Sequence, residues 1–219
     1  MASARGRLRA AAAPAVALAV VLALAGCSEG RAEPPVSNVS VDHPGGLHGA
    51  LLPKPYRVPD VTLTDTEGGR YSLTGDSTKP LTLVFFGYTH CPDICQLVMA
   101  DIASAMTRLD GADRARVGML FVTSDPARDN PAVLRRYLDR FNPRFEGLTG
   151  PMRTIKRAAD ALGVPIEKGT KLPSGGYDVA HGTQIVGMRS DGTAPVVWTE
   201  GTSPAQLAGD ITKLLHESR

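Results

Sequence analysis

The chain has 219 residues, of which 42% are hydrophobic and 21% charged, a balance that argues against a disordered polyelectrolyte and a multi-span membrane protein. Its formal charge of +2 is uneven, because Arg5, Arg7 and Arg9 lie in the first 26 residues, which contain no Asp or Glu. The remainder has 21 Lys and Arg against 22 Asp and Glu. A nearly neutral body without clustered cations argues against a nucleic-acid partner.

The N-terminal stretch predicts an export signal. Its arginines precede an apolar run over residues 10–25, which is short for a membrane-spanning helix, since such a helix needs about 20 residues. The run ends in Leu24-Ala25-Gly26-Cys27, which resembles the lipobox of bacterial lipoproteins. We therefore expect removal of residues 1–26, a lipid on Cys27, and a protein anchored to the cell membrane on its extracytoplasmic side. A plain secretory signal and an uncleaved anchor are the alternatives.

Residues 27–50 predict a flexible tether between the lipid and the folded domain. The stretch is rich in Ser, Glu, Gly and Pro and has no periodicity of 2 or 3.6 residues. His43 and His48 lie in it, and we expect both in solvent, although histidines can also contact a metal. Residues 51–219 remain for one domain, which is long enough for a single hydrophobic core.

The first half of this domain predicts a hairpin, a buried strand and a helix. Residues 61–64 and 70–73 flank a Gly-Gly turn, which is typical of a β-hairpin. The nearly continuous apolar run of residues 81–86 predicts a strand buried on both faces. Residues 92–109 place apolar side chains at helical spacing, and Pro92 suits the first turn of that helix.

The second half continues the alternation of strands and helices. A buried strand is expected over residues 117–123, and a helix from residue 131 to about residue 141 has Asp129 or Asn130 as its cap. The later elements are a helix over residues 151–162, a hairpin formed by residues 183–189 and 194–198 about Asp191-Gly192, and a helix from the Ser203 cap to His216. This order predicts an α/β domain with a central mixed sheet flanked by helices.

Two cysteines follow the first buried strand and are the candidates for metal binding or thiol chemistry. Cys91 and Cys95 are four residues apart at a predicted helix start, so one disulfide or one metal ion is within their reach. A disulfide suits an exported protein, yet closing so short a loop gains only roughly 2 kcal/mol. A helix N-terminus lowers the pKa of a thiol, which favours metal binding or thiol exchange.

The inventory of ligands favours copper over zinc. Two thiolates without a third cysteine in the domain fall short of a closed zinc site, whereas thiolates with one imidazole suit Cu(I). His181 is the candidate for that imidazole, and a purely structural role for it stays open. His90 adjoins Cys91, but its side chain is expected to leave in another direction. The methionines within apolar patterns are expected in the core: Met99, Met106, Met119 and Met188.

Three motifs in this order resemble the Sco/SenC family: the run FFGYTHCPDIC at residues 85–95, the run TSDPARD at residues 123–129, and His181. The resemblance covers the chain from about Tyr56 and implies a thioredoxin-like fold with an N-terminal β-hairpin. Members are membrane-tethered copper proteins implicated in assembling the binuclear copper centre of cytochrome c oxidase. It implies that one Cu(I) or Cu(II) is bound by Cys91, Cys95 and His181, and that the two cysteines can cycle to a disulfide.

The sequence departs from the family beside the histidine. Ala180 stands where an Asp is common, and Gly182 stands where Ser or Thr is common. The missing carboxylate removes an expected hydrogen-bond acceptor for the imidazole, and such partners orient the ring and tune metal affinity. Asp125 and Asp93 are candidates for residues that contact the metal ligands without binding the metal themselves.

These features predict a copper metallochaperone that passes its copper to the copper-binding subunit of cytochrome c oxidase or to other copper carriers. The alternative is a thiol–disulfide reductase that keeps the cysteines of the oxidase or of another carrier reduced. Oxidoreductases of this fold usually carry Cys-x-x-Cys and a facing cis-proline, whereas the spacing here is one residue longer and His181-Gly182-Thr183 takes the facing place. We expect a monomer.

Overall fold

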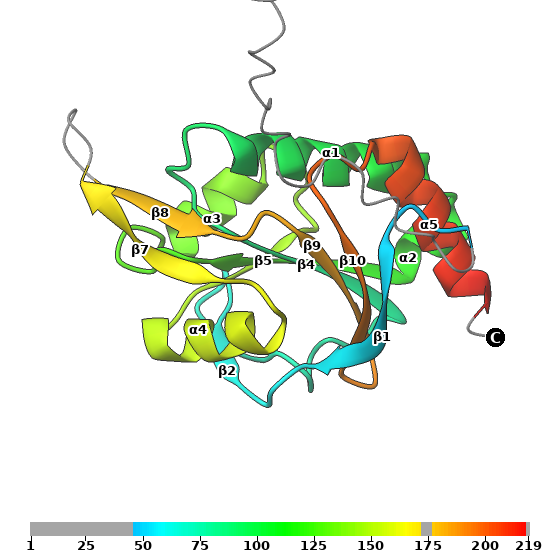
Figure 1. The fold of residues 1–219 in the computed structure, drawn as a ribbon. Coiled ribbons are helices and arrows are strands. Elements are labelled where there is room, and N and C mark those ends of the chain that lie inside the picture. The colour runs from blue at the N-terminus through cyan, green and yellow to red at the C-terminus, as the bar shows by residue number, and fades with distance from the viewer. Residues whose placement is uncertain (1–45, 172–176, 218–219) are drawn as a thin grey trace, which may run out of the picture. The chain divides into compact units, whose positions relative to one another are not determined.

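The computed structural model describes residues 46–171 and 177–217, so Cys27, His43 and the predicted export signal lie outside the described residues. The strands along these two stretches are β1 (Ala50–Arg57), β2 (Thr62–Thr64), β3 (Arg70–Ser72), β4 (Leu81–Gly87), β5 (Val117–Thr123), β6 (Glu146–Leu148), β7 (Ile166–Lys171), β8 (Tyr177–His181), β9 (Ile185–Arg189) and β10 (Thr193–Trp198). The helices are α1 (Ile94–Arg108), α2 (Gly111–Ala115), α3 (Pro131–Leu138), α4 (Met152–Ala161) and α5 (Pro204–Glu217) (Figure 1). None of these helices combines the length and the apolar composition needed to cross a membrane.

Six of the strands form a mixed sheet in the order β1-β10-β9-β4-β5-β6. The strands β4, β5 and β6 run parallel, whereas β9, β10 and β1 pair antiparallel. Figure 1 shows α1 and α5 over one face of this sheet and α4 on the opposite face, so the predicted α/β class is confirmed. The register pairs Gly87 with Thr123, so the carboxyl ends of β4 and β5 meet at one edge. Functional residues of open α/β sheets gather at such edges.

The strongest sequence patterns are confirmed. All seven residues of β4 are buried, and so are the four methionines expected in the core. The predicted hairpins appear as β2-β3 and β9-β10, with Gly192 at φ 74° in the second turn. The hydroxyl of Ser203 accepts the N–H of Gln206 at 3.3 Å, while the side chain of Gln206 accepts the N–H of Ser203 at 2.9 Å. This reciprocal capping box fixes the start of α5.

Other boundaries differ from the prediction. The helix α1 begins at Ile94 rather than Pro92, because Asp93 has non-helical angles of φ −139° and ψ −91°. Asn130, not Asp129, caps α3 by accepting the N–H of Val133 at 3.0 Å, and α3 ends at Leu138. The elements β1, α2, β6, β7 and β8 were not predicted. Strand β1 contains two prolines, which interrupt a strand pattern in sequence but are tolerated at the edge of a sheet.

The folded part also begins earlier than predicted. The sequence places a tether over residues 27–50, but Leu47 is only 2% exposed and Asp210 of α5 binds the backbone that follows it. The ring of His48 is exposed, with Nδ1 at 3.2 Å from the amide nitrogen of Gln206. Residues 47–50 therefore belong to the domain. Composition could not reveal this, since the Asp210 carboxylate that binds the backbone of His48 lies 162 residues later in the chain.

Replacing Asp210 with Ala should lower the free energy of unfolding by roughly 2–4 kcal/mol. This fully buried carboxylate accepts the backbone N–H of His48 at 2.8 Å and of Gly49 at 2.7 Å, and the indole N–H of Trp198 at 2.9 Å. The substitution leaves these donors without their acceptor. Urea unfolding measures the loss. The exposed Asp160 is the matched control, and an equally small change for both alanine variants would contradict this role of Asp210.

Candidate metal site

Three backbone segments bring the candidate ligands together: the loop after β4, the first turn of α1 and the end of β8. Cys91 lies in the loop after β4, three residues before α1, and therefore further from the helix than predicted. Its backbone N–H donates to the carbonyl of Tyr88 at 3.2 Å, which closes a turn. Cys95 is the second residue of α1, and His181 is the last residue of β8. The hairpin β7-β8 pairs Ile166 with His181 and lies outside the six-stranded sheet.

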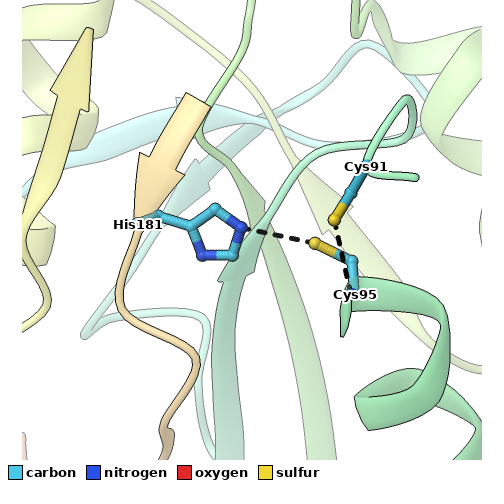
Figure 2. Close-up of side chains that lie close together, drawn as sticks. All are labelled: Cys91, Cys95 and His181. Atoms are coloured by element: carbon cyan, nitrogen blue, oxygen red, sulfur yellow. Dashed lines mark hydrogen bonds between the residues drawn. The ribbon is translucent and has the colours of Figure 1, made fainter. Parts of the chain in front are cut away.

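The ligand atoms of Cys91, Cys95 and His181 all lie within 4.8 Å of one another. Figure 2 shows the imidazole of His181 directed at the sulfur of Cys95, with an Nε2 to Sγ distance of 3.3 Å. The backbone N–H of Cys95 points at the sulfur of Cys91, at 3.5 Å. Both cysteines are buried free thiols, and the histidine is half-buried. Two sulfurs and one nitrogen at these separations can converge on one soft metal ion.

A backbone carbonyl replaces the carboxylate that the sequence lacks beside the histidine. The Nδ1 atom of His181 lies 2.9 Å from the carbonyl oxygen of Gly182. Because a carbonyl only accepts hydrogen bonds, Nδ1 carries the proton and Nε2 presents its lone pair toward the cysteines. Metal-binding histidines use such a contact to fix their tautomer and ring orientation. The expected loss of an acceptor, inferred from Ala180, is therefore compensated by the main chain.

The two thiols differ sharply in acidity. A hydrogen bond from the thiol of Cys95 is the largest cause that lowers the pKa of Cys91, from 9.0 to about 4, and the backbone N–H groups of Asp93 and Cys95 add to it against the effect of burial. The same hydrogen bond raises the pKa of Cys95, and burial raises it further. At neutral pH the pair therefore holds one thiolate and one thiol. A metal that takes both sulfurs displaces the proton of Cys95.

This asymmetry predicts the pH dependence of alkylation. In the reduced, metal-free protein, Cys91 should react with iodoacetamide at a nearly constant rate from about pH 8 down to about pH 5, because its thiolate persists above a pKa of about 4. In urea the rate should fall about tenfold per pH unit, since the pKa returns toward its ordinary value. Mass spectrometry of the modified peptide gives both rates. Identical pH profiles for the folded and unfolded protein would contradict the lowered pKa.

Two aromatic rings pack edge-on against the imidazole of His181. The ring of Tyr88 meets the ring of His181 edge-on, with centroids 5.8 Å apart, and Phe85 does so at 6.2 Å. The guanidinium of Arg128 lies 5.6 Å from the centroid of Tyr88 and forms an ion pair with buried Asp125. Asp125 thus connects to the histidine through Arg128 and Tyr88. Of these residues the sequence pattern predicted only Asp125 as a contact near the ligands, since nothing in the spacing indicated that the other side chains would stack.

Asp129 fixes the backbone of the loop that carries Cys91. Its buried carboxylate accepts the hydroxyl and the backbone N–H of Thr89, at 2.6 and 2.9 Å, and the hydroxyl of Thr123 at 2.7 Å. Thr89 is two residues before Cys91, and Thr123 ends β5. The carboxylate therefore ties the cysteine loop to the sheet, and the capping role considered for it belongs to Asn130.

The other two candidates, His90 and Asp93, are not among the three residues whose ligand atoms converge, although Asp93 lines the same hollow as Cys91 and His181. His90 is exposed, with Nδ1 at 3.0 Å from the hydroxyl of Thr89, and its ring lies outside the cluster. The side chain of Asp93 is exposed and makes no capping hydrogen bond. Within the part of the chain that the structure describes, Cys91, Cys95 and His181 form the group that could hold a metal ion.

Comparisons with known proteins place this geometry in a family. The SCO1/SenC family model matches residues 53–216. The SCO2 homologue of Danio rerio mitochondria is 35% identical over 153 residues, which is 69% of this chain and 54% of that protein. The chain thus spans about half the length of this relative.

Two solved structures are similar over nearly their whole length. Bradyrhizobium japonicum ScoI with copper bound is 31% identical, has a TM-score of 0.62, and covers 74% of this chain and 98% of its own. Apo Sco1 of Thermus thermophilus is 28% identical, has a TM-score of 0.67, and covers 78% and 96%. The fold is thioredoxin-like, as the sequence motifs implied. The chain therefore belongs to the SCO1/SenC family.

Proposed function

We propose that this protein is a copper carrier that binds one copper ion through Cys91, Cys95 and His181. The observation that carries the proposal is the convergence of two sulfurs with a deprotonated imidazole nitrogen within 4.8 Å. Soft thiolate ligands with one imidazole suit copper in low coordination. The structurally similar ScoI holds copper, which agrees with this choice of metal.

The recipient is the binuclear copper centre of cytochrome c oxidase. The Sco family is one of cytochrome c oxidase assembly proteins, which supports this recipient. Transfer proceeds by ligand exchange: a ligand of the recipient binds the copper as His181 or one sulfur leaves it. Two of the three ligands, Cys91 and His181, line a hollow of about 210 Å³, so an incoming ligand has a path to the metal.

Deleting the gene tests this function in the cell. The deletion strain should lose most of its cytochrome c oxidase activity, and added copper should restore part of it. Wild-type protein should restore activity fully, whereas the Cys91→Ser variant should not, although it is made at the same level. Full oxidase activity in the deletion strain at low copper would contradict the proposed delivery.

The chain is anchored to the extracytoplasmic face of the cell membrane through a lipid on Cys27. Replacing Cys27 with Ser should release the protein or leave it unprocessed, because the thiol is the site of lipid attachment, while the domain stays folded. Mass spectrometry of the membrane fraction checks the expected mature N-terminus and its lipid mass. An intact Met1, or a mature protein without lipid, would contradict the anchor.

The lowered pKa of Cys91 supports thiol–disulfide reduction as the second candidate function. A thiolate beside a protonated thiol is the arrangement that attacks a disulfide and then resolves the mixed disulfide. In that reaction Cys91 and Cys95 become a disulfide as the recipient's cysteines are reduced. Copper is not needed, and this difference separates the two functions.

A further inference from the structure

A pocket of about 290 Å³ lies at the edge of the sheet opposite the candidate copper site. The cysteines follow the carboxyl end of β4, whereas the pocket is built around the amino ends of the parallel strands β5 and β6. Four buried side chains form the apolar part of its wall: Met106 in the last turn of α1, Val117 and Met119 in β5, and Phe145 just before β6. None of them belongs to the copper site.

The polar part of the wall contains two cations and no acid. It consists of Arg114 in α2 and of Asn142 and Arg144 in the loop between α3 and β6. Arg114 and Asn142 are half-buried, and Arg144 is exposed. The side-chain oxygen of Asn142 accepts the backbone N–H of Arg144 at 2.9 Å, which leaves the NH₂ group of the amide as a donor. All three side chains therefore offer hydrogen-bond donors to a ligand.

The acids nearest to Arg114 have other partners. Asp110 caps α2 by accepting the backbone N–H of Asp113 at 2.7 Å. The carboxylate of Asp113 is buried and lies 3.1 Å from the ring of His216 and 3.5 Å from the guanidinium of Arg116. Within residues 46–171 and 177–217, no carboxylate forms an ion pair with Arg114. A half-buried charge without a counter-ion is costly, so a bound anion would stabilise it.

The acids on either side of Arg144 are engaged as well. Asp139 pairs with Arg135 at 2.9 Å, and the carboxylate of Glu146 accepts the hydroxyl and the backbone N–H of Thr66. In the part of the chain that the structure describes, Arg144 likewise has no acidic partner. Two guanidinium groups are thus available to one anion, and the planar fork of a guanidinium matches phosphate and carboxylate oxygens.

We propose that this pocket binds an organic phosphate that carries a short apolar chain. A phosphate has three terminal oxygens, so it can accept from Arg114, Arg144 and the amide of Asn142 together, whereas a carboxylate has only two. The apolar chain then contacts the four buried side chains of the wall. Ligand sites typically combine an apolar wall with a few polar groups in this way. A lipid headgroup and a free phosphate ester share this chemistry, and copper plays no part in the binding.

Replacing each arginine with glutamine removes a positive charge and keeps a polar side chain. Arg114→Gln and Arg144→Gln should leave the circular dichroism spectrum and the Cu(I) affinity unchanged, because neither side chain belongs to the buried core or lines the hollow of the copper site. Arg153→Gln is the matched control, since Arg153 is exposed on α4 and does not line the pocket.

Isothermal titration calorimetry of the full chain with water-soluble probes measures the binding. Hexyl phosphate should bind about 60-fold more tightly than inorganic phosphate, which is the gain from three buried methylenes at about fourfold each. Arg114→Gln should weaken hexyl phosphate binding about 10-fold and the more exposed Arg144→Gln about 3-fold, so the double variant loses about 30-fold. The control should match wild type.

A lipid probe, dihexanoylphosphatidic acid, distinguishes the two sources of the phosphate. If it binds at least as tightly as hexyl phosphate and needs the same arginines, the pocket takes a lipid headgroup. If only hexyl phosphate binds, the pocket takes a free phosphate ester. Both results support the site.

Three results would overturn the proposed site, and each of them leaves the copper site as it is. They are the absence of hexyl phosphate binding to wild type, equal affinity of wild type and the double arginine variant for hexyl phosphate, and a hexyl phosphate affinity no higher than that for inorganic phosphate or for hexanoate.

Discussion

Replacing Cys91 or Cys95 with Ser should weaken Cu(I) binding by at least about 1000-fold, which is roughly 4 kcal/mol. Either change leaves one thiolate and one imidazole, and a hydroxyl is a poor ligand for a soft metal ion. Cys95→Ala, which removes the donor, should in addition raise the pKa of Cys91, because the hydrogen bond from the Cys95 thiol is the largest cause that lowers it. Competition with a chromophoric Cu(I) chelator measures the affinity.

Cys27→Ser is the control for this pair, since Cys27 is the third cysteine of the chain and lies far from residues 91–95 in sequence. That variant should keep one copper per chain with unchanged affinity. Wild-type affinity in either Cys91→Ser or Cys95→Ser would show that the copper site needs fewer than two sulfurs, and the proposed ligand set would then be wrong.

Replacing His181 with Ala should weaken Cu(II) binding about 100-fold and Cu(I) binding less than about 10-fold. Two thiolates can still hold Cu(I) in a linear arrangement, whereas Cu(II) requires further nitrogen or oxygen ligands. The visible absorption of the Cu(II)–thiolate centre should shift as the imidazole is lost. Titration with each oxidation state and the absorption spectrum of the Cu(II) form check both expectations.

His90→Ala is the matched control, because His90 is an exposed histidine beside Cys91 whose ring lies outside the cluster of ligand atoms. It should bind both oxidation states as wild type does. Equal copper content and an unchanged Cu(II) spectrum in the His181→Ala variant would remove His181 from the site.

Strong sequence patterns were enough to predict the sheet strands β4, β5, β9 and β10 and, among the described residues, every helix except α2. The apolar run of β4 and the capping box at Ser203 report burial and hydrogen bonding directly, and both agree with the structure. The hairpin β7-β8 was missed because its sequence, IEKGTK in β7, carries no apolar alternation, and its register is irregular between Lys168 and Lys171. Yet this hairpin is what brings His181 to the cysteines.

The site was predictable in its residue types but not in its supporting contacts. The spacing joined Cys91 and Cys95, although it predicted a helix from Pro92, whereas α1 begins at Ile94, three residues after Cys91. No sequence pattern marks a backbone carbonyl as the partner of an imidazole, so the role of Gly182 required the structure. The same holds for Asp129, whose hydrogen bonds join two loops that are 40 residues apart in the chain.

Measuring transferred copper and free thiols in the same reaction tests most directly whether the protein delivers copper. The full chain is prepared with one Cu(I), without copper, and with a Cys91–Cys95 disulfide, and each form is mixed with the oxidase copper domain in its reduced and its oxidised state. The account predicts that only the copper-loaded form transfers metal, that it does so to the reduced domain with the thiol count unchanged, and that the disulfide form binds no copper. Reduction of the oxidised domain by the copper-free protein, with no copper leaving the loaded form, would contradict copper delivery and support the reductase.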